Sequence, residues 1–463
     1  MTVAAPATSA APHERLPYTT LLPFAAPYLV LGAMDIGVFV YLPQYFAAHL
    51  GVGLPLIGRV WMGVRLLDIL IDVILALLMD RTRTPIGRYR VWLPAGAPIL
   101  MLGLFKLFTA PVGFGAGYLA AWLLVMYLGY SIVYLSQSAW GARLATRYHD
   151  RSRLFGGMTA VGVVGALGIL AISILAKPLR LTDATTVPTM GWAMIIGLPL
   201  TVALCVSLTK EKIAPETRGP RFTWADVRGL LSNLELLRLF AAAFCLALGP
   251  GWMAAMYLFY FKAVRGFATP EASVLLAVYV LSQFPGALLA TRLARSIGKH
   301  RTLMLASTGF SLGLLSVLVV PKANLLATAP SLFWSGVTAG AFGLTVRAML
   351  ADVGDAVRLE QGKERISLLY STNALAQKIA AALAIGLTFP LLAAIGFNPG
   401  EHAHNTAAAL DNLQLTFLGG PIVFVMLGGA CMIGWRLDAH RHEEIRRQLE
   451  ATDARLEAAV ESQ

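Results

Sequence analysis

Residues 53–79 read GLPLIGRVWMGVRLLDILIDVILALLM, a largely apolar stretch that contains several charged side chains. A helix crosses a hydrocarbon core of roughly 30 Å with about 20 mostly apolar residues, so this stretch is long enough to span a membrane. Burying an ionisable group there costs several kcal/mol, and such a group therefore indicates function. Arg65, Asp68 and Asp72 follow i, i+3, i+7 spacing, which places them on one face of the helix. We expect this face to be turned away from lipid.

Similar apolar stretches recur along the 463-residue chain, in which 57% of residues are hydrophobic and only 13% are charged. This composition excludes an ordinary soluble protein, and the stretches lack the alternation typical of membrane barrels. We predict an all-α integral membrane protein with twelve transmembrane helices. They are expected at 23–47, 53–79, 92–111, 115–140, 154–176, 189–208, 237–261, 271–293, 300–320, 328–350, 366–394 and 413–437.

The longest polar segment, 209–236, divides these helices into six and six. Transporters with a 6+6 plan pack two bundles around a cavity near the bilayer midplane. The expected organisation is therefore two bundles with cytosolic segments around them, in the order 1–22 (tail), 23–208 (first bundle), 209–236 (central loop), 237–437 (second bundle) and 438–463 (C-terminal helix).

The net charge of +12 is distributed unevenly along the chain. Roughly 28 of the 37 Lys and Arg residues fall in the tails and the even-numbered loops, which the positive-inside rule assigns to the cytosol. We therefore expect both termini to be cytosolic and the protein to be multi-pass in the plasma membrane, or in the inner membrane if the source is bacterial. The net positive charge therefore does not indicate a nucleic-acid partner.

Cys205, Cys245 and Cys431 are scattered and have no metal-binding spacing. The chain has no phosphate-binding loop, and no arrangement with catalytic spacing appears among the helices. The sequence thus predicts a monomeric protein that is not an enzyme, with no cofactor and no metal beyond a possible Na⁺.

The charges within the predicted spans gather at similar depths. Counted from the cytosolic helix ends at 1.5 Å per residue, Asp68 lies about 16 Å deep, Asp72 about 10 Å, Lys378 about 18 Å and Asp35 about 20 Å. Two carboxylates within one turn repel each other, so they need a cation, a proton or basic partners. We predict a cation site at Asp68 and Asp72 that is coupled to Arg65 and Lys378. The alternative is a fixed ion-pair network, and Asp35 is either a solute ligand or a structural partner of a basic group.

Polar and aromatic side chains follow helical spacing in the fourth span and continue in the eleventh. Rings can cover the C–H faces of a polyol while amides and hydroxyls satisfy its oxygens, so this pattern favours a sugar site. The alternative is hydrogen bonding between helices. Besides Asp35, the candidate solute ligands are Tyr127, Tyr130, Tyr134, Gln137, Asn373 and Gln377.

Two loops with Gly followed by basic residues occur at equivalent places, 80–90 in the first bundle and 291–301 in the second. Their charges, including Asp80 and Arg88, would form contacts that open and close with a cytosolic gate. The simpler alternative is that the basic residues only obey the positive-inside rule.

The run from Asp68 and Asp72 into residues 80–92 resembles the glycoside-pentoside-hexuronide:cation symporters, the melibiose-carrier branch of the major facilitator superfamily. Residues 139–153, residues 351–355 with 362–365, and Lys378 strengthen the resemblance, which covers nearly the whole chain. It implies a major facilitator fold and a coupling-cation site at Asp68 and Asp72. Further implied roles are a ligand hydroxyl from Ser131, a link between cation and solute from Lys378, and a cytosolic gate that includes Trp140, Asp352, Asp355 and Arg365.

The function expected on these grounds is Na⁺- or H⁺-coupled symport of a small glycoside, sugar or uronate by alternating access. Its partners would be the solute, the coupling cation and the lipid bilayer. Two alternatives stay open from sequence: a transporter of an amphipathic solute such as a lysolipid or drug, and a solute sensor that keeps the fold but does not transport.

Overall fold

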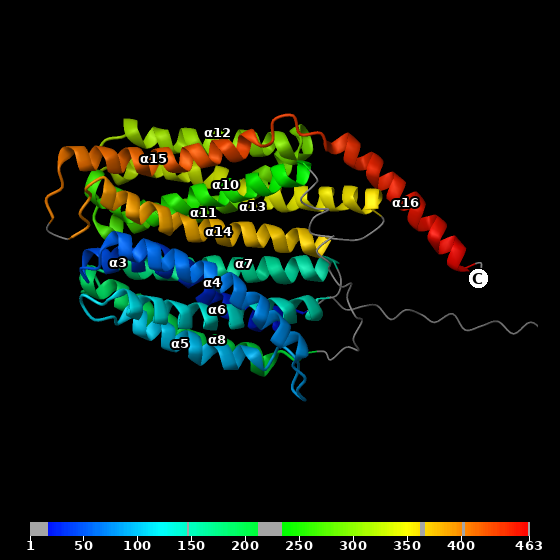
Figure 1. Ribbon diagram of the computed structural model, residues 1–463, viewed down its shortest axis with the longest axis horizontal. Helices are drawn as coiled ribbons and strands as arrows, with labels where there is room; N and C mark the ends of the chain where they lie inside the picture. Colours follow the sequence, from blue (N-terminus) through cyan, green and yellow to red (C-terminus); the bar gives the residue numbers. More distant parts are fainter. Residues whose placement is uncertain (1–16, 146–147, 212–233, 362–365, 401–402, 462–463) are drawn as a thin grey trace, which may run out of the picture.

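The computed structural model describes residues 17–145, 148–211, 234–361, 366–400 and 403–461 as a bundle of long helices (Figure 1). The first spanning helix is built from consecutive segments, α1 (Tyr18–Ala25), α2 (Pro27–Ile36), the π-helical turn η1 (Gly37–Tyr41) and α3 (Leu42–Ala48). The rest of the N-terminal half consists of α4 (Leu54–Arg81), α5 (Trp92–Phe108), α6 (Ala116–Leu144), α7 (Tyr148–Ile174) and α8 (Asp183–Leu208).

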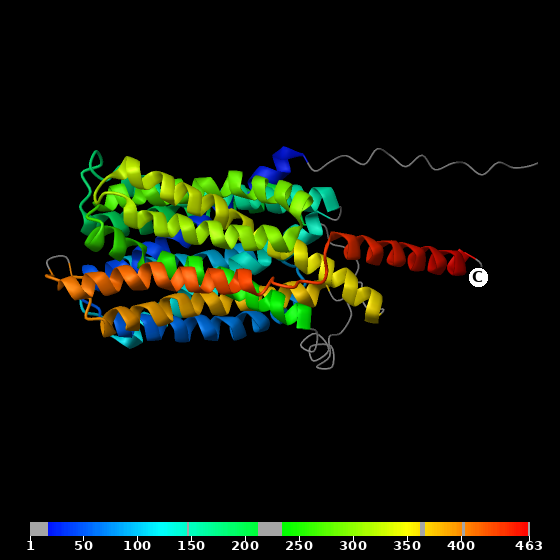
Figure 2. The ribbon, with the colours of Figure 1, turned by 90° about the horizontal axis from the view of Figure 1, so that it is seen from above.

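The C-terminal half repeats this plan, and its first spanning helix also contains a π-helical turn, here at its end. Its elements are α10 (Leu234–Phe259), η2 (Tyr260–Val264), α11 (Thr269–Ile297), α12 (Lys299–Ser316), the short η3 (Val317–Val319), α13 (Leu325–Gln361), α14 (Ile366–Ala394) and α15 (Ala407–Ala430). A final helix, α16 (Ala439–Glu461), projects from the bundle beside the C-terminus, and Figure 2 shows the same arrangement from above.

The described residues contain twelve spanning helices. Ten are long and apolar by composition alone, and α5 is a shorter apolar helix. The twelfth is α4, which is a continuous helix of 28 residues. Its apolar sequence is interrupted by charged residues at Arg59, Arg65, Asp68 and Asp72. The expectation of an all-α, twelve-helix fold is confirmed.

Two helix boundaries differ clearly from those expected. α13 continues to Gln361 instead of ending near residue 350, because the polar stretch after Leu350 extends the helix beyond the apolar span. α15 is Ala407–Ala430 rather than 413–437, and a turn with a positive φ at Gly434 follows it. Hydropathy locates the membrane-spanning part of a helix, and helices can extend past it.

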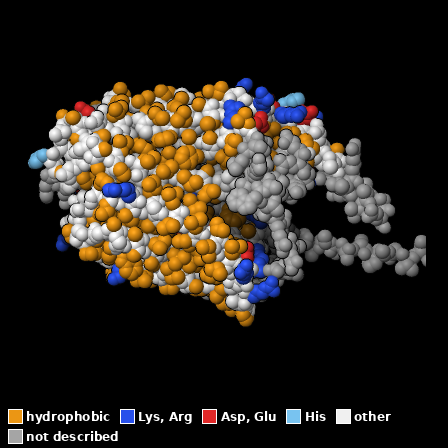
Figure 3. Space-filling model, in the orientation of Figure 1, with side chains coloured by type: hydrophobic (Ala, Val, Ile, Leu, Met, Phe, Trp, Pro, Cys, Tyr) orange, Lys and Arg blue, Asp and Glu red, His pale blue; other side chains and the backbone are white. Residues whose placement is uncertain are grey.

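The surface separates into an apolar middle and a charged end. Hydrophobic side chains cover the middle of the face shown in Figure 3, and Lys and Arg gather at the end from which α16 projects. We call this the basic end; its described residues include Arg81, Arg143, Arg238, Arg295 and Arg436. The described residues of the opposite end form loops 49–53, 109–115, 175–182, 265–268, 320–324, 395–400 and 403–406.

The two halves meet mainly where α4 packs along α14 and where α7 packs along α11. Glycines allow the first of these crossings to be close. A Cβ added to Gly58 of α4 would lie 2.6 Å from Cδ of Pro390, and one added to Gly386 of α14 would lie 2.6 Å from Cβ of Met62. Small residues let helix backbones approach within a membrane, so these glycines bring α4 and α14 into direct contact.

At the opposite end, polar side chains join the halves. Lys262 of η2 and Thr269 of α11 both donate to Oδ2 of Asp183 of α8, at 2.9 and 2.7 Å. Ser273 of α11 is hydrogen-bonded to Tyr41 of η1 at 2.5 Å and to Ser173 of α7 at 2.7 Å. Both π-helical turns therefore supply a side chain to this closure.

The close crossing of α4 and α14 predicts that Gly58→Leu destabilises the folded protein. The added side chain would overlap Pro390 and Phe389, and overpacking of this kind typically costs about 1–3 kcal/mol. Thermal unfolding in detergent should show a lower midpoint for Gly58→Leu than for the wild type. Gly63→Leu is the matched control on the same helix, because a Cβ there meets no atom of the described residues within 4 Å. Equal midpoints for the two variants would contradict the proposed crossing.

Candidate functional site

An ionic cluster connects the two halves in the middle of the bundle. Nζ of Lys378, on α14, lies 3.1 Å from Oδ2 of Asp68, on α4, and also forms an ion pair with Asp72 one turn further along α4. Arg65 lies 3.3 Å from the same Oδ2 of Asp68. Asp68 is fully buried, and its charge is balanced within the protein. Two cations and two carboxylates thus share one site, as their spacing on α4 indicated.

Neighbouring side chains hold this cluster in place. Ser131 of α6 donates a hydrogen bond of 3.0 Å to the other oxygen of Asp68, Oδ1. The guanidinium of Arg65 lies over the rings of Tyr127, at 4.6 Å, and Phe39, at 5.3 Å. Trp61 in turn donates to the Tyr127 hydroxyl at 3.0 Å. Cation–π contacts of this kind stabilise a desolvated guanidinium, so the two rings help to hold Arg65 beside Asp68.

One oxygen of the cluster is not used by these contacts. Oδ1 of Asp72 is buried and has no hydrogen-bond partner among the described residues. Together with both oxygens of Asp68 and the hydroxyl of Ser131 it makes a set of hard oxygen donors. Hard cations such as Na⁺ prefer such donors, and a proton could equally be taken up by a carboxylate. The side chains present therefore fit a small cation.

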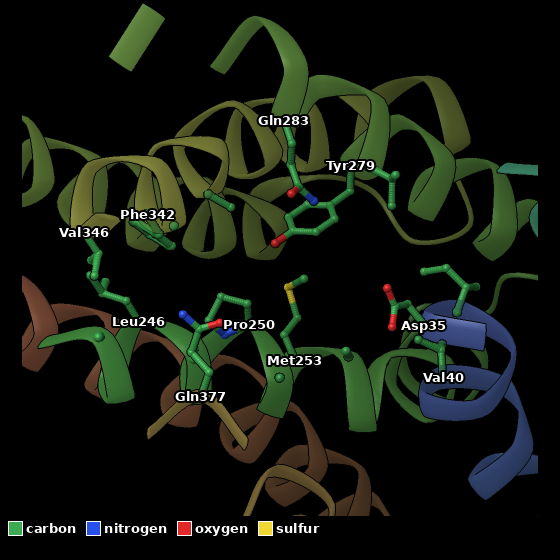
Figure 4. Close-up of a pocket in the computed structure, with 18 of the residues that line it drawn as sticks. Asp35, Val40, Leu246, Pro250, Met253, Tyr279, Gln283, Phe342, Val346 and Gln377 are labelled. Carbon is green, nitrogen blue, oxygen red and sulfur yellow. The ribbon is translucent and has the colours of Figure 1, made fainter. Parts of the chain in front are cut away.

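Beside the cluster lies a central cavity formed by three adjoining hollows of about 400, 560 and 420 Å³, all of which Asp35 lines. The largest of the three is also lined by Arg65, Asp72 and Lys378, so the ionic cluster forms part of its wall. Figure 4 shows that Asp35, Gln377, Gln283 and Tyr279 project into one of the hollows. Volumes of this size are typical of small-molecule sites.

Several of the predicted solute ligands line this cavity. Tyr130 and Tyr134 of α6 stack with their ring centroids 5.8 Å apart and form an aromatic wall beside Asp35. Gln377 lies next to Lys378 on α14 and contributes an amide. Asp35 itself is exposed to the cavity and forms no ion pair with another described residue. It is thus available to a solute.

The other predicted ligands lie elsewhere. Tyr127 is buried behind Arg65, and Gln137 donates to the main-chain oxygen of Phe24 at 2.6 Å, so both join α6 to neighbouring helices. Asn373 is buried, and its Oδ1 lacks a partner among the described residues. None of these three side chains lines the hollows described above. The stripe on α6 therefore divides between the cavity and interhelical contacts.

The sequence analysis missed three residues of the cavity wall. Gln283 and Tyr279 lie one turn apart on α11, and Arg347 lies on α13. The i, i+4 spacing of Tyr279 and Gln283 within an apolar helix could have indicated the first two. Arg347 lies near the end of the expected tenth span, 328–350. Since α13 continues to Gln361, Arg347 is located well inside the helix and faces the cavity.

The residues predicted to form a gate lie at the basic end, in a separate network within each half. In the N-terminal half Tyr89 donates to Asp80 at 2.8 Å, and Arg143 lies 5.1 Å from the centroid of the Tyr89 ring. Burial first, and then the hydrogen-bonded Asp80 carboxylate, raise the pKa of Tyr89 above its ordinary value, which keeps the hydroxyl protonated as a donor. Trp140 is fully buried edge-on against Phe24, with ring centroids 5.1 Å apart. Arg88 has partners as well.

In the C-terminal half, Lys299 forms an ion pair of 2.6 Å with Asp352, and His442 of α16 lies 3.0 Å from Asp355 and 3.5 Å from Asp352. The C-terminal helix is thereby attached to the end of α13. Arg365 lies outside the described residues, so its predicted gate contact stays a prediction.

Comparison with known proteins identifies relatives along nearly the whole chain. The model of the family described as MFS/sugar transport protein matches residues 23–439. The isoprimeverose transporter of Lactiplantibacillus pentosus is 23% identical, covering 87% of this chain and 85% of that protein. A putative glycoside/cation symporter of Escherichia coli, YagG, is also 23% identical and covers 88% of this chain and 89% of its own length.

Among solved structures, a mutant of the nucleoside transporter NupG superposes with a TM-score of 0.68 at 11% identity. The alignment covers 89% of this chain and 98% of that protein, so the two share a fold.

The contacts of the cluster predict how its stability responds to charge removal. Lys378→Gln leaves Asp68 and Asp72 with one positive partner, and an uncompensated buried charge typically costs about 3–5 kcal/mol. Adding Asp72→Asn restores the charge balance and should recover a large part of the lost stability. Thermal unfolding of the two single variants and the double variant would measure this coupling. A double variant whose loss equals the sum of the single losses would show that the two groups do not interact.

Proposed function

From the premise that the chain belongs to the MFS/sugar transport protein family, we propose that Asp68 and Asp72 couple a cation to the uptake of a small glycoside, pentoside or uronate. The protein is a multi-pass membrane transporter and not an enzyme. Its relatives bear the names of sugar and glycoside/cation transporters, and these names support sugar symport over transport of an amphipathic solute or a sensor role.

The observation that carries the proposed mechanism is that one ammonium group, that of Lys378, serves both carboxylates of α4. In the absence of a bound cation, Lys378 and Arg65 together balance the charges of Asp68 and Asp72. A Na⁺ ion at these oxygens, or a proton on one carboxylate, competes with Lys378 for the same negative charge. Cation binding therefore weakens the ion pairs of Lys378 with Asp68 and Asp72.

Release of Lys378 changes the hydrogen-bonding groups available to the solute, because its ammonium group lines the cavity beside Gln377. An ammonium group freed from the carboxylates can donate hydrogen bonds to solute oxygens. Cation and solute then favour each other's binding, and by thermodynamic linkage each raises the affinity for the other by the same factor. Because α4 and α14 belong to different halves, loading of the site also acts on the interface along which the halves move.

We further propose that the basic end faces the cytosol. The concentration of Lys and Arg at that end supports this orientation through the positive-inside rule. The state described here is closed at the opposite end by Asp183 with Lys262 and by Ser273 with Tyr41. In this orientation that closure faces the outside of the cell.

The cation proposal is tested by Asp68→Asn and Asp72→Asn in proteoliposomes with imposed Na⁺ or H⁺ gradients. Each variant should lose gradient-driven accumulation of the solute, because its cation site lacks one carboxylate. Asp411→Asn, at an exposed position near the start of α15, is the matched control and should accumulate solute like the wild type. Accumulation by both site variants at the wild-type level would overturn the cation site, and comparison of the two gradients identifies the coupling ion.

The orientation is tested with a cleavable tag placed after Gln463, beyond α16. Protease added to sealed right-side-out vesicles should leave the tag intact, and protease added to inside-out vesicles should remove it. Cleavage in the sealed right-side-out vesicles would place the basic end outside the cell.

A further inference from the structure

Arg347 is a charged residue of the cavity wall that the coupling mechanism does not use. It lies on α13, where its neighbours Val346, Met349 and Leu350 are buried while its own side chain is exposed to the cavity. Arg65 and Lys378 each have a carboxylate partner. Among the residues that the structure describes, no carboxylate lies within 4.0 Å of the Arg347 guanidinium. An ionisable group inside a membrane bundle without a partner indicates a role in binding.

The surroundings of Arg347 are those of a site for an oxygen-rich molecule. The hollow that it lines also contains the Asp35 carboxylate and the amides of Gln283 and Gln377. Figure 4 shows Asp35, Gln283 and Gln377 approaching the same space from different helices. Arg347 also lies close enough to Tyr28, on the other half, for the two side chains to interact electrostatically. Its charge is therefore felt across the cavity.

The charges around the cavity are balanced before any ligand binds. Arg65, Lys378 and Arg347 supply three positive charges, and Asp35, Asp68 and Asp72 supply three negative ones. A bound cation adds one positive charge to this set. A solute with one negative charge would balance it.

The geometry of an arginine side chain suits one kind of anionic group in particular. The guanidinium presents a planar fork of N–H donors that matches the two oxygens of a carboxylate. The Asp35 carboxylate and the amide oxygens in the hollow can accept hydrogen bonds from hydroxyls, and the amide NH₂ groups can donate to ring or glycosidic oxygens. A hexose whose C6 is oxidised to a carboxylate supplies both kinds of group.

We propose that the solute is a sugar acid, a uronate or a glycoside of one, whose carboxylate binds Arg347 while its hydroxyls bind Asp35, Gln283 and Gln377. This proposal rests on the sugar symport proposed above and selects one solute class within it. Arg347 is then the residue that discriminates a uronate from the neutral sugar of the same shape.

Counterflow exchange in proteoliposomes tests this assignment with matched sets of probes. Each set contains a methyl glycoside, the corresponding methyl glycosiduronate and the methyl ester of that uronate, for glucose, galactose and mannose in both anomers. The wild type should exchange the uronate of at least one set with an affinity about 10- to 100-fold higher than that for its neutral members, as expected for a charge-assisted hydrogen bond. The methyl ester separates the effect of charge from that of size.

Arg347→Gln should lose this preference, so that the affinity for the uronate falls to about that for the neutral glycoside. Arg347→Lys should retain part of the preference because it keeps the charge but not the planar fork. Arg59→Gln controls for the loss of an arginine from the bundle. Arg59 lies near the start of α4, away from the cavity wall, and donates to the main-chain oxygen of Pro55 in its own helix.

The possible results separate this inference from the function on which it rests. Exchange of neutral glycosides without preference for the uronates would overturn the role of Arg347 and leave sugar symport intact. Equal loss of neutral and anionic exchange in Arg347→Gln, with folding retained, would also overturn it. Exchange of no probe in any set by the wild type would overturn both proposals.

Discussion

The ammonium group of Lys378 is held between the carboxylates of Asp68 and Asp72, and both the contact between the halves and the proposed mechanism depend on it. It needs α4 and α14 to run close together, which Gly58 and Gly386 allow. It also needs Asp68 to be oriented, which Ser131 and Arg65 provide. Because the three ionic groups lie on elements of different halves, their charge balance is a property of the assembled bundle. A change in that balance therefore acts on the contact between the halves.

Much of the fold follows from the sequence because the bilayer imposes a simple length and polarity requirement on each helix. The charges on α4 were predicted to share one face, and the structure places Arg65 and Asp68 in contact on that face. The approach of Lys378 to the same level could be expected from counting residues along its helix, because the rise per residue is constant. These predictions rest on regular helix geometry, which is independent of the neighbouring helices.

What the sequence could not provide is which side chains meet across helices. The polar stripe of α6 has one periodicity, yet Ser131 faces Asp68, Tyr130 faces the cavity and Gln137 binds Phe24. Periodicity identifies a face, and the neighbouring helices decide what that face contacts. The ion pair of Asp183 with Lys262 joins residues from different halves, so no local pattern indicates it.

The π-helical turns η1 and η2 have a consequence for how the protein can diverge. A π-helical turn contains an additional residue, and one residue of an α-helix corresponds to a rotation of about 100° about its axis. In the first spanning helix, Asp35 precedes the turn and faces the cavity, while Tyr41 at the end of the turn contacts Ser273. In the C-terminal half, Met253 precedes η2 and lines the cavity, while Lys262 within η2 contacts Asp183. In each helix, residues before the turn reach the cavity, and the turn supplies a contact that closes the opposite end. Mutations before each turn can change which solute binds while the closure contacts of Tyr41 and Lys262 are preserved. Paralogues with new specificities can therefore arise without loss of the closure.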